Sequence, residues 1–358
     1  MRSRLRAESS SEDTATIIPL AIIQSVQRTP KAKLLFLALV AVVALLLHVA
    51  IGSSAWISPL DVIHQIAIGD QGQRGSPENV IVWQLRLARA VGCGLVGFIL
   101  GAVGSAFQAL FRNPLAEPYV VGVSSGAAVG GTLAIWLGLE AVWGGLGSMP
   151  FAFLGGMGSL MLVVSLSRRR GVISVPTLLL VGVVLSAVLS GVLSWILVAS
   201  GQDTNRLVQW LLGTTANLGW SRVTVLTVIT CLGIPYLAAQ AKVLNAFSVS
   251  EESALRLGVD TRTLTWSILT AGSAMAAIAV AATGIIGFVG LVGPHISRRI
   301  LGPDLRWSLM GSALLGSALL LLADIVAQRA VANTEVPIGA VTAVLGAPML
   351  LVLLRKRL

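Results

Sequence analysis

The sequence is poor in charged residues. Only 11% of its 358 residues are Asp, Glu, Lys or Arg, whereas 55% are hydrophobic. Soluble domains carry about 25% charged residues, so a shortage of this size excludes a soluble globular domain. The composition therefore predicts an integral membrane protein.

Cysteine and histidine are also scarce. Cys93 and Cys231 both lie inside apolar runs and form neither a disulfide framework nor a metal-binding motif. His48, His64 and His295 lie far apart, and no Glu-x-x-His or paired-carboxylate pattern accompanies them. A membrane enzyme is therefore poorly supported, and we expect no metal site in this chain.

The Gly-Lys-Ser/Thr phosphate-binding loop is absent, because no lysine follows a glycine anywhere in the chain. If ATP is used, a partner must hydrolyse it. Carboxylates inside the apolar runs are rare, which argues against an ion-coupled secondary transporter. Asp324 is the exception. A local ion pair with Arg329 explains it at least as well as a role in transport.

Long apolar runs dominate the chain. They are continuous and about 20 residues long, the length of a membrane-spanning helix, and do not alternate with period two as membrane strands do. A polar tail of residues 1–33 precedes one transmembrane domain of residues 34–358. We predict ten spans, at residues 34–52, 86–110, 119–139, 149–167, 175–199, 222–240, 264–282, 284–300, 307–327 and 338–354.

Basic residues indicate the orientation of these spans. All but six of the 25 Lys and Arg residues fall in segments that an even number of spans places on the side of the N-terminal tail. Because basic residues favour the cytoplasmic side, both termini and the polar segment 245–262 are expected in the cytoplasm. The six exceptions, on or near the outer side, are Arg74, Arg86, Arg89, Arg206, Arg222 and Arg329.

Small and capping residues predict some local contacts. Gly97/Gly101 and Gly126/Gly130 have the small-xxx-small spacing that lets helices approach closely. In the loop 53–85, Ser58 followed by Pro59 predicts a short helix that ends near Ile68.

The polar segment Asn245–Arg262 has the pattern of a short amphipathic helix. Ser250 fits its cap, Glu251 and Glu252 its first turn, and Gly258 its end. Such a helix offers a surface to a partner, although an ordinary connecting loop has the same composition. The apolar positions are Ala254, Leu255, Leu257 and Val259.

Three motifs follow one another along the chain. The first runs from Phe111 to Pro118 and continues from Gly122 to Ala127, the second from Gly284 to Arg298, and the third from Glu335 to Gly339 with Gly346-Ala347-Pro348. In this order they resemble the FecCD-type permeases, the membrane subunits of ABC importers for iron–siderophores, haem and cobalamin. The resemblance covers residues 55–355. Its motif positions are Arg112, Asn113, Pro114, Pro118, Gly122, Gly126, Gly290, Pro294, His295, Glu335, Pro337 and Gly339.

The resemblance implies an all-α polytopic fold of type II ABC importer permease architecture in the bacterial cytoplasmic (inner) membrane. It implies no enzyme activity and no cofactor in this chain, since ATP and Mg belong to two ATP-binding partner subunits. The other implied partners are a second permease subunit, identical or paralogous, a periplasmic or lipoprotein substrate-binding protein, and membrane lipid, but no nucleic acid. We expect an iron–siderophore cargo, with haem or cobalamin as alternatives. An ion-coupled secondary transporter is the alternative from another class.

The resemblance also assigns residues to roles. A coupling region of residues 243–263 would contact the ATPase through Glu251, Glu252, Ala254, Leu255, Arg256, Leu257 and Gly258.

On the outer side, Arg86, Arg89 and Arg329 would dock the binding protein, with snorkelling to the membrane interface as the alternative. The chain has Ala88 where the family usually has proline and Leu305 where a histidine is common. Small residues near 92–104 and 122–131 are expected to leave room for a large chelate.

Overall fold

The computed structural model describes residues 30–52, 57–72, 75–169, 172–173, 175–256, 258–331 and 334–355. Most of the predicted tail 1–33 lies outside them. Within the described residues the protein is a bundle of helices, and its only strands are β1 (Arg168–Arg169) and β2 (Val172–Ile173), which pair as an antiparallel hairpin. The predicted all-α fold is confirmed.

The helices follow one another with short connections. In chain order they are α2 (Pro30–Ile51), α3 (Pro59–Ile68), α4 (Pro77–Val80), the π-helix η2 (Ile81–Leu87), α5 (Ala88–Leu110), α6 (Val123–Trp136), η3 (Leu139–Ala141), α7 (Val142–Gly145), α8 (Ser148–Ser167), α9 (Val175–Ala199), η4 (Gly201–Asp203), α10 (Thr204–Leu211), α11 (Trp220–Val249), α12 (Glu251–Arg256), α13 (Thr261–Thr283), α14 (Val289–Leu301), α15 (Leu305–Arg329) and α16 (Ile338–Arg355).

In the described part of the chain, seven helical segments are long and apolar enough to cross a membrane. They are α2, the continuous α4–η2–α5, α8, α9, the first two thirds of α11, α13 and α15. An eighth segment is formed if α6 is counted together with the following η3–α7, whose axis is bent by 97° from that of α6. Together with the shorter α14 and α16 they correspond to the ten predicted spans.

The predicted span 119–139 is too long. α6 covers only Val123–Trp136, because Gly122 before it and Gly138 after it adopt left-handed backbone angles with φ of 79° and 72°. These angles interrupt the helix at both ends.

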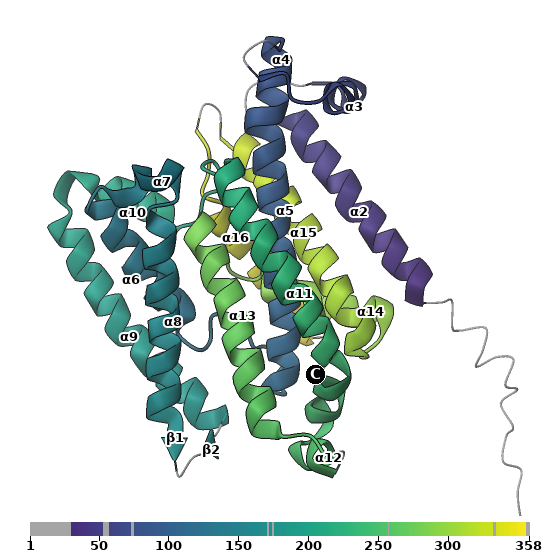
Figure 1. The fold of residues 1–358 in the computed structure, drawn as a ribbon, viewed down its shortest axis with the longest axis vertical. Coiled ribbons are helices and arrows are strands. Elements are labelled where there is room, and N and C mark those ends of the chain that lie inside the picture. The colour runs from purple at the N-terminus through teal and green to yellow at the C-terminus, as the bar shows by residue number, and fades with distance from the viewer. Residues whose placement is uncertain are drawn as a thin grey trace, which may run out of the picture.

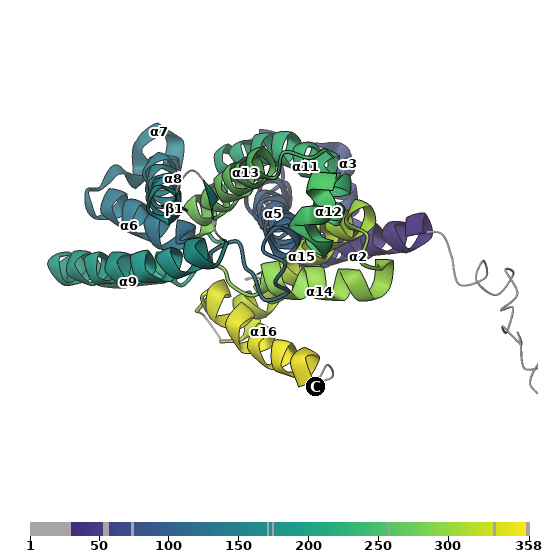
Figure 2. The same cartoon turned by 90° about the horizontal axis from the view of Figure 1, so that it is seen from below.

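The bundle has two distinct ends. Figure 1 shows α3, α4, α7 and α10 at one end, here called the α3 end, and α12 with the β1–β2 hairpin at the other, here called the α12 end. Seen along the helices in Figure 2, α5 lies near the centre, whereas α6, α8 and α9 form a group to one side.

Glycines bring the helices into contact as predicted. A Cβ atom added at Gly97 or Gly101 of α5 would overlap a backbone carbonyl of α15, at Gly316 or Ser312 respectively. Side chains at these glycines would therefore separate the two helices.

The second predicted pair acts in the same way. Gly126 and Gly130 of α6 lie against the α8 carbonyls of Gly155 and Phe151. The space beside these glycines is thus occupied by neighbouring helices of the same subunit. This corrects the expectation that these small residues leave room for a large chelate.

The short helix predicted after Ser58 is confirmed as α3. The Ser58 Oγ atom accepts a hydrogen bond from the Asp61 N–H, and Pro59 occupies the first helical turn. Its cap thus satisfies one of the backbone N–H groups that a helix start leaves unpaired.

Candidate functional site

At the α12 end, the polar segment 245–262 divides between three helices. Residues 245–249 complete α11, α12 is a separate helix of six residues, and α13 begins at Thr261. The Ser250 Oγ atom accepts from the Ser253 N–H at 3.0 Å, which confirms the predicted cap.

The predicted end of α12 is also confirmed. Gly258 has φ of 77°, and its N–H donates to the Leu255 carbonyl at 2.9 Å. The Val259 N–H donates to the Ala254 carbonyl at 3.1 Å, so the helix closes with a Schellman motif.

The outer surface of α12 is mostly charged. Glu251, Glu252, Leu255 and Arg256 are exposed, and Arg256 pairs with Glu252 at 2.8 Å. Ala254 is fully buried and packs inward. It therefore offers no surface to a partner, contrary to the prediction. Leu257, the remaining apolar position of the predicted coupling set, lies outside the described residues.

A polar junction joins α11 to α15 beside α12. The Asn245 side chain donates to Asp304 Oδ1 at 2.7 Å and accepts from the Leu305 N–H at 2.9 Å. Asp304 also caps α15 by accepting from the Arg306 N–H at 3.0 Å. Its hydrogen bonds to the Arg306 side chain are the main cause that lowers the pKa of Asp304 to about 2. The Asp304 cap was readable from the sequence, but its pairing with Asn245 was not.

The first family motif lies between α5 and α14. Arg112, with φ of 51°, places its guanidinium 5.5 Å from the ring centre of Phe247 in α11. Asn113 caps the following turn by accepting from the Leu115 N–H at 2.9 Å, and Pro114 is exposed between them. The loop after α5 is therefore held near the α12 end.

The first and second motifs also touch each other. Glu117 Oε1 accepts from the Phe288 N–H at 3.1 Å, and burial raises the pKa of Glu117. Pro118 packs against Gly290 so closely that a Cβ there would lie 2.6 Å from the proline ring. Pro294 and His295 are buried further along α14.

The third motif packs on the loop after α10. The Gly339 N–H donates to the Leu212 carbonyl at 3.0 Å, and an added Cβ at Gly339 would overlap that carbonyl. Pro337 precedes α16, and Glu335 pairs with Arg89. The motif thus joins the start of α16 to the α3 end.

The three predicted docking arginines all lie at the α3 end, but two of them face inward. Arg86 is only 7% exposed and donates to the Val49 and Ala50 carbonyls at 3.0 and 3.1 Å. Arg329 is exposed and donates to the Ile51 and Gly52 carbonyls. Arg86 and Arg329 therefore both hold the end of α2 in place.

Arg89 binds two carboxylates. Its Nε and Nη2 atoms donate to Asp324 at 2.9 and 3.0 Å, and its Nη1 atom donates to Glu335 at 2.9 Å. The Arg89 side chain is 13% exposed, so Arg89 offers little surface to a partner. Ala88, the departure from the family pattern, lies where α5 continues η2 without a break.

Asp324 is the centre of a buried cluster that sequence reasoning missed. It is fully buried and also accepts from His48 Nε2 at 2.6 Å, Thr215 Oγ1 at 2.5 Å and Gln328 Nε2 at 2.9 Å. The suggested local pair with Arg329 is wrong, because Asp324 pairs with Arg89 of α5, whereas Arg329 donates to the Ile51 and Gly52 carbonyls. A cavity of about 240 Å³ borders Arg89, Asp324 and Glu335.

The cluster does not suit a metal ion. The ligand atoms of His48, Cys93 and Asp324 lie within 4.8 Å of one another. However, both Asp324 oxygens already accept hydrogen bonds, and the positive charge of Arg89 opposes a cation at this place. The cluster is better described as an internal ion pair that joins α2, α5 and α15.

The chain matches known proteins over most of its length. The sequence profile of the FecCD transport family matches residues 39–356. The cobalamin import system permease protein BtuC of Halobacterium salinarum is 42% identical over 287 residues, which cover 80% of this chain and 76% of that protein. The vitamin B12 import system permease protein BtuC of Yersinia enterocolitica is 36% identical over 285 residues, 78% of this chain and 82% of that protein.

A solved structure has the same fold. It is described as an inward-facing conformation of a metal-chelate type ABC transporter, is 32% identical in sequence and superimposes with a TM-score of 0.79. The match covers 92% of this chain and all of that one.

Proposed function

We propose that this chain, which belongs to the FecCD transport family, carries a corrinoid of the cobalamin class. The chain is the permease subunit of an ABC importer and not an enzyme. Its apolar helices make it a multi-pass protein of the inner membrane. The family implies an ATPase, a substrate-binding protein and a second permease subunit as partners.

The names of two relatives support the corrinoid cargo. Permeases that are 42% and 36% identical to this chain over more than three quarters of its length are named for cobalamin or vitamin B12 import. The expected iron–siderophore cargo has no comparable support and stays a prediction, as does haem.

We propose that the α12 end faces the cytoplasm and receives the ATPase. The exposed charged surface of α12 and the excess of basic residues on this side support the assignment. Hydrogen bonds hold both termini of α12, so this helix would move as a rigid unit when the ATPase moves. The α3 end, which carries Arg329, then faces the binding protein.

ATP-driven closure of the ATPases would move α12 and switch the path between its outward and inward states. The hydrogen bonds of Asn245 with Asp304 and Leu305 join this movement to α15. α15 extends to the α3 end, where Asp324 holds Arg89. The path itself would lie between two permease subunits.

Transport by the purified complex tests the cargo. The permease, with its ATPase and binding protein, would be reconstituted in liposomes and supplied with cyanocobalamin, a ferric siderophore or haem. We expect ATP-dependent uptake of cyanocobalamin alone, and thermal stabilisation of the binding protein by cyanocobalamin alone. Uptake of the siderophore or haem without uptake of cyanocobalamin would overturn the corrinoid assignment but leave the importer assignment intact.

A further inference from the structure

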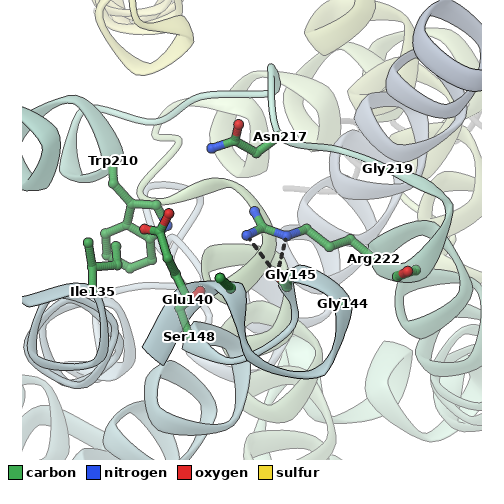
Figure 3. Close-up of a pocket in the computed structure, with 11 residues that line it drawn as sticks. Ile135, Glu140, Gly144, Gly145, Ser148, Trp210, Asn217, Gly219 and Arg222 are labelled. Carbon is green, nitrogen blue, oxygen red and sulfur yellow. Dashed lines mark hydrogen bonds between the residues drawn. The ribbon is translucent and has the colours of Figure 1, made fainter. Parts of the chain in front are cut away.

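A second cavity, of about 270 Å³, lies at the α3 end and shares no lining residue with the cavity beside Asp324. Its walls come from α6, η3, α7, α8, α10, the loop before α11 and the start of α11. Figure 3 shows the Arg222 guanidinium pointing across the cavity towards Trp210 and Glu140. The cavity is far too small for a corrinoid, so the cargo does not explain it.

Two donors in the wall of this cavity have no hydrogen-bond partner. They are the indole N–H of Trp210 and the hydroxyl of Ser148, on side chains that are 5% and 1% exposed. An unpaired buried polar group destabilises the fold, because it has lost its hydrogen bonds to water and gained none in the protein. An acceptor in the cavity would remove this cost twice.

Arg222 adds a buried positive charge. Its Nε and Nη2 atoms donate to the Gly145 carbonyl at 3.2 and 3.1 Å, and its Nη1 atom donates to the Ala282 carbonyl at 2.9 Å. A guanidinium has five N–H groups, so these carbonyls leave two for another acceptor. Among the residues that the structure describes, no carboxylate lies within 4.0 Å of the Arg222 guanidinium nitrogens.

The backbone holds these groups in place. Trp143 and Gly144 have left-handed angles, with φ of 54° and 67°, inside α7. This turn precedes Gly145, whose carbonyl orients Arg222. On the other side, Gly131 of α6 accommodates the six-membered ring of Trp210, which a Cβ there would overlap.

The charges around the cavity favour an anion. Its one acidic lining residue, Glu140, is partly exposed and pairs with Arg206. Glu140 also acts electrostatically on Arg222, but it is shared with Arg206, so two positive charges face one negative charge here. A carboxylate matches this set, because it carries one negative charge, accepts two parallel hydrogen bonds from a guanidinium and has further lone pairs for an indole N–H and a hydroxyl.

We propose that this cavity is a carboxylate-binding site in which Arg222, Trp210 and Ser148 are the donors. The carboxylate is either a small free one or an acidic side chain of the binding protein. The second source rests on the proposed orientation of the chain, whereas the first does not.

Acetate is the probe that tests the site. The permease–ATPase complex in lipid nanodiscs would be titrated with sodium acetate and, separately, with sodium chloride at equal ionic strength. The signal is the tryptophan fluorescence of the unchanged protein minus that of Trp210→Phe. We expect a saturable change with acetate and none with chloride.

Three further variants bear on this test, two at the donors Ser148 and Arg222 and one at Glu140. Ser148→Ala removes one donor and is expected to weaken acetate binding about tenfold, the effect of a lost hydrogen bond to a charged group. Glu140→Gln removes a nearby negative charge and is expected to strengthen it. Arg222→Gln would abolish binding but also frees α7, so the conclusion does not depend on that variant.

Docking of the binding protein distinguishes the two sources. If one of its acidic side chains enters the site, Ser148→Ala and Trp210→Phe weaken docking, and acetate competes with it. If the ligand is a free carboxylate, acetate binds while docking is unchanged. No saturable acetate signal together with unchanged docking in both variants overturns the proposal, and so does an acetate affinity that Ser148→Ala leaves unaltered.

Discussion

At the scale of single residues, burial decides which charges matter. Asp324 is fully buried and accepts hydrogen bonds from four side chains, whereas the Glu252–Arg256 pair is exposed on α12. Removing one partner of a buried ion pair costs about 3–5 kcal/mol, while an exposed pair four residues apart on a helix contributes about 0.3–0.5 kcal/mol. The stability of the α3 end therefore depends on Asp324 far more than on any surface pair.

Asp324→Asn tests this dependence. The substitution keeps the shape of the side chain but leaves the charge of Arg89 without its main partner, and we expect a loss of about 3–5 kcal/mol in the free energy of unfolding. The measurement is thermal or denaturant unfolding in detergent. Asp203→Asn, at an exposed aspartate, is the control and should change stability by less than about 0.5 kcal/mol. Equal effects of the two substitutions would contradict the role of the cluster.

Asp304 predicts a pH dependence at the α12 end. Its pKa is about 2 in the folded protein and about 3.9 for an ordinary aspartate. Because the folded pKa is the lower one, the carboxylate stabilises the fold above about pH 4, and this contribution is lost as the pH falls towards 2. The difference in melting temperature between the unchanged protein and Asp304→Asn should therefore shrink below about pH 4. A difference that stays constant down to acid pH would rule this out.

At the scale of helices, glycines determine how closely the elements pack. The contact of α5 with α15 is the largest between any two helices of the described chain. Along it the glycines of α5 face backbone atoms of α15 directly. In lipid, where burial of apolar surface drives helices together only weakly, such close packing supplies much of the attraction.

Gly101→Ala is expected to weaken this contact. The new Cβ would overlap the Ser312 carbonyl, which belongs to the backbone and cannot rotate away, so α5 and α15 must separate. We expect a loss of about 1–3 kcal/mol, the usual cost of overpacking, measured as a lower melting temperature. Gly158→Ala in α8 is the matched control, since no atom lies within 4 Å of its added Cβ. Equal behaviour of the two variants would refute the argument.

The proposed coupling role of α12 is tested by Glu252→Arg. The change replaces an attractive pair with Arg256 by a repulsive one and reverses the charge offered to the ATPase. We expect ATP-dependent uptake and the stimulation of ATPase activity by the binding protein to be lost, with normal insertion into the membrane. Asp203→Arg at the α3 end is the control. Normal uptake with unchanged ATPase stimulation in Glu252→Arg would exclude the coupling assignment.

At the scale of the whole molecule, α15 connects the two ends. Its first turn is tied to α11 through Asp304 and Asn245, and its last turns are tied to α5 through Asp324 and Arg89. A rigid helix held by polar contacts at both ends suits the proposed arrangement, in which the ATPase binds at the α12 end and the binding protein at the α3 end.

Docking at the α3 end is expected to depend on Arg329, the exposed member of the three arginines. Arg329→Glu should weaken binding of the substrate-binding protein at low ionic strength, and the difference should nearly vanish at about 1 M salt, where charges are screened within about 3 Å. Arg299→Glu, at an exposed position of α14, is the control. Affinity unaffected by Arg329→Glu at every salt concentration would exclude the docking role. Arg86 and Arg89 are unsuitable for this test because their side chains are only 7% and 13% exposed and offer little surface to a partner.

The sequence alone determined the features that local patterns encode. Continuous apolar runs require helices in lipid, glycine spacing indicated where α5 and α6 meet their neighbours, and the caps at Ser58 and Ser250 indicated where short helices begin. The family motifs are enough to indicate the importer class, and the match of residues 39–356 to the FecCD transport family agrees with them.

Only the tertiary structure decided which distant residues meet. Arg89 and Asp324 are 235 residues apart, and His48 and Asp324 are 276 apart, so no local pattern could pair them. The same holds for Arg222 and Trp210, which line one cavity although they belong to different helices. Local sequence specifies helices and their ends, whereas the pairing of buried polar groups depends on how the helices pack.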